Sequence, residues 1–404
     1  MRILNLIPSV DPARGGSIEA VRVLQKPVEA RGHRWEIASL DAPDAECVRN
    51  CFAKTYALGP ARGFYAYSPS FHRDLAVILR DFDVAVIHGI WQYHAFGGWR
   101  ALQQTPLPYA VYPHGMLDPY FRRAFPLKHL KKWLVWPWSE YRILKGAGAV
   151  CFTGESEKLL ARESFWLYQA KERVVGLGTS APTENADAAR AAFLAQFPAQ
   201  QNRRFLLYIA RIAPKKGLDL LLEAFAALFA ENKLPPDLDL VIAGPDSDGW
   251  RAQLEAKFIA PELEKRIHWT GMIGGEVKWG AFHACEAFVL PSHQENFGIA
   301  VAEALAREIP VLISDQVNIW REIESENAGI VAPDTLVGTR KLLESWLALS
   351  NAERKTMRQN AKRCFESHFS IDGAGEKLVA CLEEIRGKNS PQRRGDAEKS
   401  RKAL

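Results

Sequence analysis

The sequence predicts an α/β protein with two domains, each built on a doubly wound parallel sheet. Short apolar runs alternate with helical patterns in the first half of the chain, a polar stretch rich in Ala and Pro interrupts them, and the alternation then starts again. The chain has 404 residues, of which 48% are hydrophobic, so each half can bury a core of its own.

Five apolar runs in the first half have the length and composition of buried parallel strands. They cover residues 3–8, 35–40, 84–88, 109–113 and 149–153. Polar residues, Gly and Pro gather where these runs end. Because ligands of open α/β sheets bind at the carboxyl ends of the strands, we expect the functional residues of this half there.

The second half repeats the pattern. The expected strands cover 204–210, 238–244, 267–271, 287–291 and 310–314, with helices over 217–231, 249–259 and 297–307. We therefore predict a first domain over 1–180, a linker over 181–202, a second domain over 203–365, a helix over 366–386 that packs back on the first domain, and a disordered basic tail over 387–404. The ligand is expected in a cleft where the two domains face each other.

Charge and cysteine content exclude several classes of protein. The net charge of +5 comes from 52 basic and 47 acidic residues, which argues against a nucleic-acid partner but suits a polyanionic small molecule or an anionic membrane surface. Six cysteines in so long a chain make no disulfide framework, so we expect a cytoplasmic protein. The amino-terminal apolar run is too short for a signal peptide, and no stretch has the ~20 apolar residues that cross a bilayer.

Metal and dinucleotide sites are not expected. Cys47 and Cys51 have no second Cys or His pair at zinc spacing. Asp-x-Asp occurs at 81–83 and 237–239, which we interpret as turns before strands, and at 246–248 on the expected ligand side. The segment GLGTSA at 176–181 imitates a dinucleotide fingerprint, but the acid expected ~20 residues further on is missing and no clear helix follows.

The stretch HQENFGIAVAEA at 293–304 places two carboxylates, Glu295 and Glu303, around an apolar run that follows a predicted strand. A helix that starts there would offer backbone N–H groups and the positive end of its dipole to an anion at Phe297, Gly298 and Ile299. With a helix start near residue 296, the carboxylates would lie ~12 Å apart, beyond the about 5–9.5 Å of a glycosidase pair. This spacing suits an extended ligand such as a nucleoside diphosphate sugar.

A basic loop follows the first predicted strand of the second domain. RIAPKKG at 211–217 sets Arg211 and Lys216 five positions apart, with a Pro to shape the loop and a Gly to open the next helix. Two cations so placed can clamp a diphosphate leaving group. Basic residues in an isolated loop are common, and the anion-ready helix start in the same domain is what favours this interpretation.

Together these motifs resemble those of the retaining glycosyltransferases of the GT-B type, family four. The similarity is carried by Glu-x7-Glu around Asn-Phe-Gly, by the Pro-Val strand after it and by Arg-x4-Lys-Gly after a strand, and it extends over nearly the whole chain. It implies two Rossmann-like domains that face each other across a cleft, with the acceptor bound mainly by the first and the donor mainly by the second.

The resemblance also implies a role for each matching residue of the second domain. Arg211 and Lys216 would stabilise the departing diphosphate, and Glu295 would contact hydroxyls of the donor sugar. The expected donor-binding residues are Phe297, Gly298 and Ile299 at the diphosphate, Glu303 at the ribose, Gly271, Met272 and Ile273 at the base, and Asn296. No nucleophile is needed, since the family is assigned a front-face route in which the leaving phosphate takes the acceptor's proton.

In the first domain, Gly15 and Gly16 follow the first predicted strand, as the family's glycine loop does, and would let the backbone approach the diphosphate and acceptor. His114 ends the strand predicted at 109–113 and matches the family histidine that borders the reacting sugar. His88 also ends a strand and is a secondary candidate.

The segment 120–145 carries seven Lys or Arg against one Glu, interleaved with Trp133, Trp136 and Trp138. This mixture is typical of a surface at an anionic membrane, where a lipid-linked acceptor would be found. The alternative is a pair of core-packed helices with solvated faces, because Pro126 and Pro137 break any long amphipathic helix.

The predicted function is retaining transfer of a sugar from a nucleoside diphosphate sugar to a glycan or lipid-linked glycan, as in exopolysaccharide or lipopolysaccharide synthesis. We expect a cytoplasmic, metal-independent enzyme without a cofactor, peripheral on the inner face of the cell membrane. An epimerase or phosphorylase of related fold, and a non-catalytic nucleotide-sugar-binding protein, remain open as alternatives. The base, the sugar and the acceptor cannot be predicted, because they depend on cleft loops without a readable code.

Overall fold

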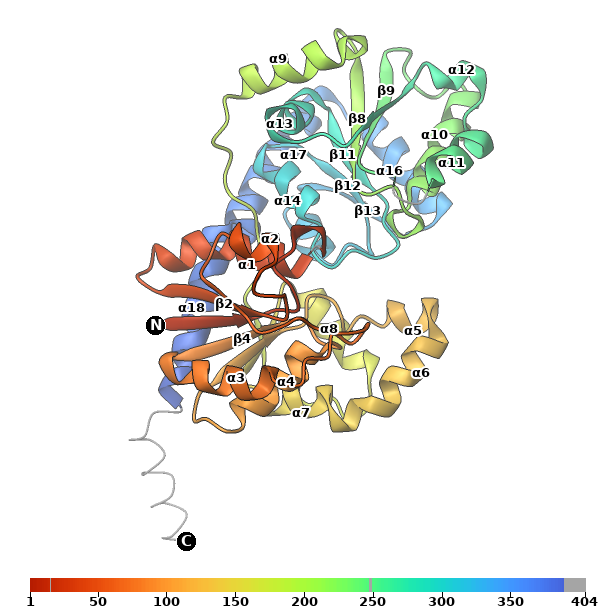
Figure 1. The fold of residues 1–404 in the computed structure, drawn as a ribbon. Helices are drawn as coiled ribbons and strands as arrows, with labels where there is room; N and C mark the ends of the chain where they lie inside the picture. The colour runs from red at the N-terminus through yellow and green to blue at the C-terminus, as the bar shows by residue number, and fades with distance from the viewer. Residues whose placement is uncertain (15, 247–248, 389–404) are drawn as a thin grey trace. The chain divides into compact units, whose positions relative to one another are not determined.

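The computed structural model describes residues 1–14, 16–246 and 249–388 and divides into two compact units. Unit 1 comprises Met1–Leu177 and the chain from Ile371 onward, and unit 2 comprises Gly178–Ser370 (Figure 1). The chain therefore leaves unit 1, completes unit 2 and returns to unit 1 for its last described helix. Of the tail predicted over 387–404, all but the first two residues lie outside the described residues.

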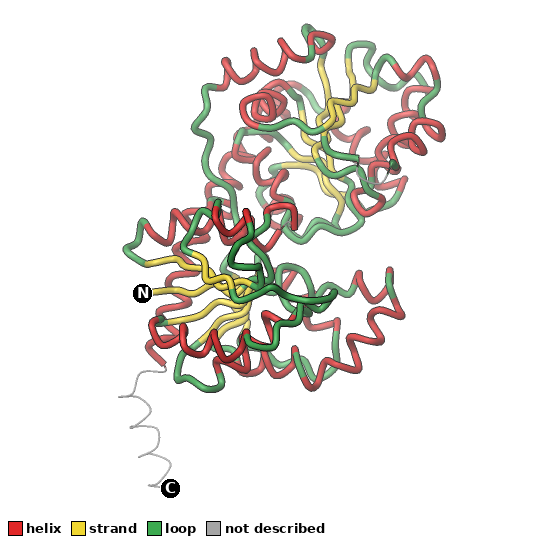
Figure 2. The backbone as a smooth tube through the Cα atoms, in the orientation of Figure 1, coloured by secondary structure: helices red, strands yellow, loops and turns green. Residues whose placement is uncertain are grey.

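Unit 1 is built on a seven-stranded parallel sheet in the order β3-β2-β1-β4-β5-β6-β7. Figure 2 shows the strands in yellow. The strands are β1 (Arg2–Leu6), β2 (Arg34–Ser39), β3 (Thr55–Ala57), β4 (Val84–His88), β5 (Tyr109–Tyr112), β6 (Ala149–Phe152) and β7 (Glu172–Val174). The winding reverses at β1, which pairs with both β2 and β4. In such sheets the ligand edge lies at the carboxyl ends of the strands beside this reversal.

Helices cover both faces of the unit 1 sheet (Figure 1). On one face, α1 (Gly16–Glu29) and α18 (Ile371–Lys388) pack so closely that a Cβ at Gly375 would lie 2.6 Å from the Cβ of Pro27. The other α-helices of this unit are α2 (Glu46–Arg49), α3 (Phe71–Ile78), α4 (Tyr93–Leu102), α5 (Tyr120–Ala124), α6 (Pro126–Val135), α7 (Glu140–Gly146) and α8 (Glu155–Ser164). Across the described parts of the chain, no helix is both long and apolar enough to cross a membrane.

Unit 2 repeats this design with a six-stranded parallel sheet in the order β10-β9-β8-β11-β12-β13. The strands are β8 (Arg204–Ile209), β9 (Leu238–Ala243), β10 (Ile267–Gly271), β11 (Ala287–Leu290), β12 (Val311–Ser314) and β13 (Gly329–Ala332). Here the winding reverses at β8, which pairs with both β9 and β11. The expected ligand edge therefore lies at the carboxyl ends of β8 and β11.

The helices of unit 2 begin inside the segment predicted as a linker over 181–202. Within it, α9 packs against α13, and a Cβ at Gly280 would lie only 2.0 Å from the carbonyl oxygen of Ala189. Small residues allow this approach, and Phe193 is fully buried in the contact. The α-helices are α9 (Ala186–Gln196), α10 (Leu218–Ala230), α11 (Trp250–Phe258), α12 (Pro261–Glu264), α13 (Gly275–Ala284), α14 (Ile299–Ala306), α15 (Trp320–Ser325), α16 (Leu336–Ala348) and α17 (Asn351–Cys364).

The predicted fold class is confirmed, since both units are doubly wound parallel sheets. All ten predicted strands are present, with their ends displaced by two residues at most. The strands missed by the sequence analysis are β3, β7 and β13, which lie at or near sheet edges and have mostly exposed or half-buried side chains. Such strands lack the continuous apolar run that marks a buried parallel strand.

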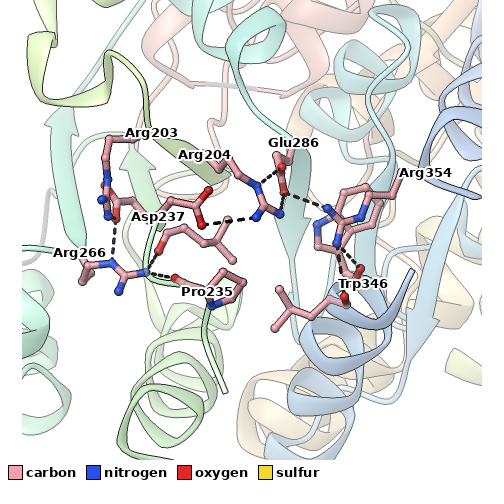
Figure 3. A network of polar contacts seen from close by, with 11 residues as sticks. Arg203, Arg204, Pro235, Asp237, Arg266, Glu286, Trp346 and Arg354 are labelled. Atoms are coloured by element: carbon pink, nitrogen blue, oxygen red, sulfur yellow. Dashed lines mark hydrogen bonds and ion pairs between the residues drawn. The ribbon is translucent and has the colours of Figure 1, made fainter. Parts of the chain in front are cut away.

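At the amino ends of the unit 2 strands, charged side chains pair with one another (Figure 3). Arg204 at the start of β8 donates to the Glu286 carboxylate at 2.5 and 3.0 Å and lies 3.5 Å from the Asp237 carboxylate. Arg354 lies 3.7 Å from the other side of Glu286 and donates to the Trp346 carbonyl at 3.2 Å. This edge of the sheet therefore uses its charges to fasten strands and helices together.

Asp239 corrects the interpretation of 237–239 as a turn, because it is a buried residue of β9. Burial opposes ionisation of its carboxyl, but hydrogen bonds from His268 at 3.1 Å, from Arg203 and from Arg266 at 2.9 Å outweigh burial and lower its pKa. The partners come from neighbouring strand ends, so no local pattern around Asp239 announces them.

Candidate functional site

Two loops meet at the carboxyl edge of the unit 2 sheet. The basic loop, residues 211–217, follows β8, and the acidic loop, residues 291–298, follows β11. Gly217 has a left-handed φ of 66°, and a Cβ there would lie 1.9 Å from the carbonyl oxygen of Pro291. Any larger residue would push the two loops apart, so the glycine is what lets the basic loop lie against the acidic one.

The basic loop holds its two predicted cations differently. Lys216 forms an ion pair with Glu295, and the two side chains are only 13% and 20% exposed. The N–H of His293 donates to the Lys215 carbonyl at 2.9 Å and fixes the register of the two loops. Arg211 is exposed, and no acidic group among the described residues pairs with it. Its charge is therefore available to an anionic ligand.

Helix α14 begins at Ile299, which is two residues after the start of the helix predicted over 297–307 and three after residue 296, from which the carboxylate spacing was calculated. Gly298 is its N-cap, with a left-handed φ of 73° that an L-residue rarely adopts, and it turns the chain before the helix. Only the steps from Ile299 to Glu303, roughly 6 Å, are helical. The ~12 Å separation of the two carboxylates therefore no longer follows from helical rise.

The first turn of α14 still presents what an anion site needs. Its leading N–H groups have no acceptors within the helix, and the dipole places partial positive charge there. Phe297 lies just before the helix, and its ring is buried. The centroids of the Phe297 and Phe369 rings are 5.8 Å apart, so the loop is anchored to the core of unit 2. The N–H of Asn318 donates to the Glu295 carbonyl at 2.9 Å and holds the other side of the loop. Asn296 lies half-buried between them.

Glu303 is a buried carboxylate on α14. Lys278 of α13 lies 2.7 Å from it, and the Arg307 guanidinium donates to the Glu303 carbonyl at 3.1 Å. The same guanidinium stacks 3.7 Å above the Trp279 ring. A carboxylate that meets one lysine keeps lone pairs for further donors, so Glu303 can still accept hydrogen bonds from ligand hydroxyls.

Residues predicted to hold the base follow β10 at the same edge. Gly271 ends that strand with a φ of 68°, and its carbonyl accepts the N–H of Gly244 at 2.9 Å. Gly244 in turn allows no side chain, because a Cβ there would lie 1.9 Å from the Ala210 carbonyl oxygen. The loops after β8, β9 and β10 are thus packed together, with Met272 exposed by 80% and Ile273 half-buried.

Asp246 lies on the expected ligand side, but its carboxylate binds the start of helix α11. Its carboxylate accepts the N–H groups of Trp250 at 2.9 Å and Arg251 at 3.1 Å at the start of α11. Asp248 lies outside the described residues. The Asp-x-Asp motif at 246–248 therefore begins with a residue that serves helix α11.

In unit 1, His114 lies in the turn after β5 in a left-handed conformation, with a φ of 53°. This conformation is uncommon for a residue other than glycine, and Gly115 continues it with a φ of 74°. The Glu157 carboxylate holds the turn, accepting the N–H of Gly115 at 2.6 Å and the N–H and hydroxyl of Thr153 at 2.7 Å. Strained backbone that is held so firmly is a frequent mark of functional positions.

A chain of hydrogen bonds leads from His114 into the core of unit 1. His114 Nε2 lies 3.0 Å from His88 Nδ1, and His88 Nε2 lies 3.0 Å from Asn5 Oδ1. Burial lowers the pKa of His114 and of neighbouring His94 to about 4 and that of His88 well below its ordinary value. All three imidazoles are therefore neutral at pH 7.

The structure describes only one of the two glycines, Gly15 and Gly16, that were predicted near the reaction centre. Gly15 lies outside the described residues. Gly16 is the first residue of α1, and a Cβ there would meet no atom of the described residues within 4 Å. The space beside Gly16 is open, so a ligand can approach its backbone.

The sequence analysis missed three residues that support the candidate site: Asn5 contacts His88, Glu157 holds the turn that contains His114, and Lys278 contacts Glu303. Asn5 could have been recognised from the sequence, because it is a polar residue inside the otherwise apolar run ILNLI, and a buried polar side chain needs a hydrogen-bond partner. Glu157 and Lys278 look like ordinary helix-surface charges in the sequence, and their partners come from other elements. These two contacts depend on tertiary structure alone.

The chain matches two family descriptions that follow its two halves. Residues 15–178 match "Glycosyl transferase 4-like domain", and residues 190–363 match "Glycosyl transferases group 1". These two matches define the class as enzymes that transfer sugars. The chain belongs to the group 1 glycosyltransferases, as its motifs predicted.

Curated relatives agree with this family. Alpha-D-kanosaminyltransferase of Streptomyces kanamyceticus is 29% identical over 252 residues, which are 61% of this chain and 63% of that protein. The serotype-specific mannosyltransferase WbdA of Escherichia coli is 29% identical over 145 residues, 35% of this chain and 17% of WbdA. These alignments thus span less than two thirds of the relatives' own length.

Solved structures agree with the predicted GT-B fold. Sucrose-phosphate synthase from Thermosynechococcus elongatus has a TM-score of 0.74 at 20% identity, over 95% of this chain and 98% of that one. HepE of Anabaena, solved with UDP and glucose, has a TM-score of 0.72 at 16% identity, over 95% of this chain and 99% of that one. At such identities the likeness concerns the fold.

Proposed function

We propose that this chain is a retaining glycosyltransferase that moves a sugar from a nucleoside diphosphate sugar to a glycan or a lipid-linked glycan, as in exopolysaccharide or lipopolysaccharide synthesis. Its family supports sugar transfer. The WbdA similarity supports a polysaccharide acceptor, since that protein is described as a serotype-specific mannosyltransferase. HepE was also solved with UDP-glucose, which supports a uridine donor as the first to test.

The observation that carries the proposal is the set of charges at the carboxyl ends of β8 and β11. Arg211 is exposed and unpaired within the described residues, and the first turn of α14 offers N–H groups at the same edge. Together they suit a diphosphate. The Glu295 and Glu303 carboxylates suit the hydroxyl groups of the sugar and the ribose, which donate hydrogen bonds.

The proposed chemistry needs charge stabilisation more than a nucleophile. As the bond between the sugar and the diphosphate breaks, Arg211, Lys216 and the α14 amides would stabilise the charge that develops on the leaving oxygen. The acceptor hydroxyl attacks from the same face, and its proton passes to a leaving phosphate oxygen, so the configuration is retained. We propose that no metal is required, because the protein supplies the cations.

Binding and turnover of nucleotide sugars test this proposal directly. The full chain is titrated calorimetrically with UDP-glucose, GDP-mannose and ADP-glucose, and release of the free nucleotide is followed with EDTA present. We expect one base to be preferred and the bound donor to be hydrolysed slowly. Binding without release would favour the non-catalytic alternative, and no binding of any donor would overturn the assignment.

An exposed apolar and basic surface on unit 1 supports the membrane part of the proposal. Helix α6 buries none of its residues. We define the α6 surface by its exposed apolar side chains, which are Phe125, Leu127, Leu130, Trp133, Leu134, Val135 and Trp138. The predicted alternative of core-packed helices applies to Trp136, which is fully buried, and to α7, which buries Ile143 and Leu144, but not to α6.

Basic residues accompany the α6 surface, and no acidic residue occurs between 120 and 139. Lys132 lies 4.4 Å above the Trp91 ring, and burial lowers its pKa to about 8. Lys128 and Lys131 lie on the same helix. We propose that this surface docks on anionic lipid, where lysines remain near the headgroups and the apolar side chains enter the interface.

Vesicle sedimentation tests this surface. The full chain is mixed at low salt with vesicles of phosphatidylcholine alone or with phosphatidylglycerol added. We expect sedimentation only with the anionic vesicles and its loss in Leu127→Glu/Leu134→Glu. The control is Val337→Glu, which changes an equally exposed apolar residue of unit 2. Equal behaviour of the double variant and the native chain would contradict the proposed docking.

A further inference from the structure

The hydrogen bonds behind His114 determine where its proton lies. Asn5 Nδ2 lies 3.0 Å from the backbone carbonyl of Glu36 and donates to it, since a carbonyl can only accept. This contact fixes the orientation of the Asn5 amide. Its oxygen therefore faces His88 Nε2 at 3.0 Å and must accept a hydrogen bond from it. His88 thus carries its proton on Nε2.

The next bond follows from the first. His88 is fully buried and neutral, so its Nδ1 has a lone pair and no proton. His114 Nε2, at 3.0 Å, must then be the donor of this bond. His114 is neutral too, which leaves an unprotonated Nδ1 on the other side of its ring.

Aromatic rings and one further histidine surround the two imidazoles. Tyr112 stacks on His88 at 5.7 Å and on His114 at 4.7 Å, and the edge of Trp35 meets His88 at 6.5 Å. His94 Nε2 lies 2.9 Å from the His88 carbonyl and donates to it. Burial nevertheless lowers the pKa of His94 to about 4, so this neighbour adds no charge at pH 7. The Glu157 carboxylate is directed to the backbone of the His114 turn.

We propose that Asn5 and His88 are positioning residues, which hold His114 as a hydrogen-bond acceptor for a hydroxyl group of the bound sugar. His114 is the partly exposed member of the chain, whereas Asn5 and His88 have no exposed surface. A hydroxyl can donate a hydrogen bond to the Nδ1 lone pair. An ionised carboxylate or phosphate in the same place has no proton to donate, so its lone pairs would be repelled by that of Nδ1. The inference rests on the proposed function and adds that the sugar is neutral at this position.

The proton positions can be measured without any ligand. The full chain is labelled with 15N-histidine, and long-range 1H–15N correlation spectra at pH 7 identify the tautomer of each ring. Loss of one ring pattern in His114→Gln assigns His114. We expect a protonated Nε2 and a bare Nδ1. A proton on Nδ1, or on both nitrogens, would overturn the proposal whatever the protein binds.

Two substitutions of His88 separate positioning from packing. In His88→Gln the side-chain oxygen can accept from His114 and the amide can donate to Asn5, so the tautomer and turnover should be kept. In His88→Leu the acceptor is lost, and we expect mixed tautomers and about a tenfold fall in turnover of the nucleotide sugar that the native chain prefers among the three tested. Equal losses in both variants, or none in either, would contradict the positioning role.

If His88→Leu does not fold, the spectrum of the native chain still tests the predicted tautomer, and His88→Gln still tests whether the tautomer and turnover are kept. If the native chain has the expected tautomer but binds none of the three donors, the proposed function fails and the hydroxyl-acceptor role fails with it. A native chain that turns over a donor with His114 in the opposite tautomer overturns only the present inference.

Discussion

Units 1 and 2 wind their sheets in the same way, yet they place opposite chemistry at the reversal of winding. At the carboxyl ends of β1, β4 and β5, unit 1 has neutral groups, with His88 and His114 joined through their rings. At the corresponding ends of β8 and β11, unit 2 has Arg211 and the Lys216–Glu295 ion pair. The sheet topology determines where a ligand can bind, and the burial of the side chains at that edge determines whether they are charged or neutral.

This contrast assigns different ligand groups to the two units. In the proposed function, unit 2 would offer charge to a diphosphate and carboxylates to hydroxyls, whereas the candidate site of unit 1 would offer uncharged hydrogen bonds. Within unit 2 the same contrast recurs between the two edges of one sheet, because the amino edge has its arginines paired while Arg211 at the carboxyl edge has no acidic partner among the described residues.

Acid should separate the two units most strongly. Unfolded His88, His94 and His114 would bind protons near pH 6.5, but burial lowers their pKa in the folded state. Unfolding therefore takes up protons as the pH falls from about 6.5 towards 4, and each histidine costs unit 1 about 1.4 kcal/mol of stability per pH unit. Hydrogen exchange at pH 7 and pH 5, corrected for intrinsic rates, should detect weaker protection of the unit 1 strands.

In unit 2 the corresponding groups are carboxylates. Hydrogen bonds hold the pKa of Asp239 and Glu184 below the ordinary value, despite burial, so their contribution is lost only below about pH 4. His94→Gln, which can still donate to the His88 carbonyl, should reduce the loss in unit 1. Equal loss of protection in both units at pH 5 would refute the contrast.

Among single substitutions, we expect the largest effect on turnover from Arg211 of unit 2. Arg211→Ala removes a group expected to stabilise the leaving diphosphate, and we expect turnover of the preferred donor to fall by about 10²–10³-fold. The release of free nucleotide measures this. Lys355→Ala, which removes an exposed charge on α17, is the control and should retain activity. Unchanged turnover in Arg211→Ala would remove it from the site.

The turn that contains His114 and Gly115 should be destabilised by removal of the Glu157 carboxylate that holds it. Glu157→Ala removes the carboxylate that accepts from Gly115 and Thr153, and we expect a loss of about 2–3 kcal/mol in the free energy of unfolding. Glu157→Gln keeps one acceptor oxygen and should lose less. Chemical denaturation followed by circular dichroism compares them, and a loss below ~0.5 kcal/mol in the alanine variant would show that the turn is held by other contacts.

The smallest effect should come from Glu303. Glu303→Ala removes a predicted ribose contact and leaves Lys278 without its carboxylate partner, so the donor dissociation constant should rise about tenfold. Calorimetry with the preferred donor measures it. Glu344→Ala, which changes an exposed carboxylate on α16, should bind like the native chain. A donor affinity that is unchanged in Glu303→Ala would exclude the ribose contact.

The sequence predicted the sheets well because buried parallel strands are continuous apolar runs, and it missed β3, β7 and β13 because their side chains are only partly buried. The start of α14 was misplaced because Gly298 adopts a left-handed turn where a helical Gly was assumed. Local motifs indicated Arg211, Lys216 and Glu295 as candidates, and the structure brings the last two together. The contacts of Glu157 with Gly115 and of Lys278 with Glu303 could not be predicted, because these partners are distant in sequence.

The return of the chain to unit 1 through α18 has a consequence for synthesis on the ribosome. Unit 2 is contiguous, so it can form as soon as residue 370 has emerged. Unit 1 lacks the helix that packs on α1 until residues 371–388 have also been made, and until then the face of α1 around Pro27 stays uncovered. Unit 1 begins before unit 2 in the chain but is therefore completed after it.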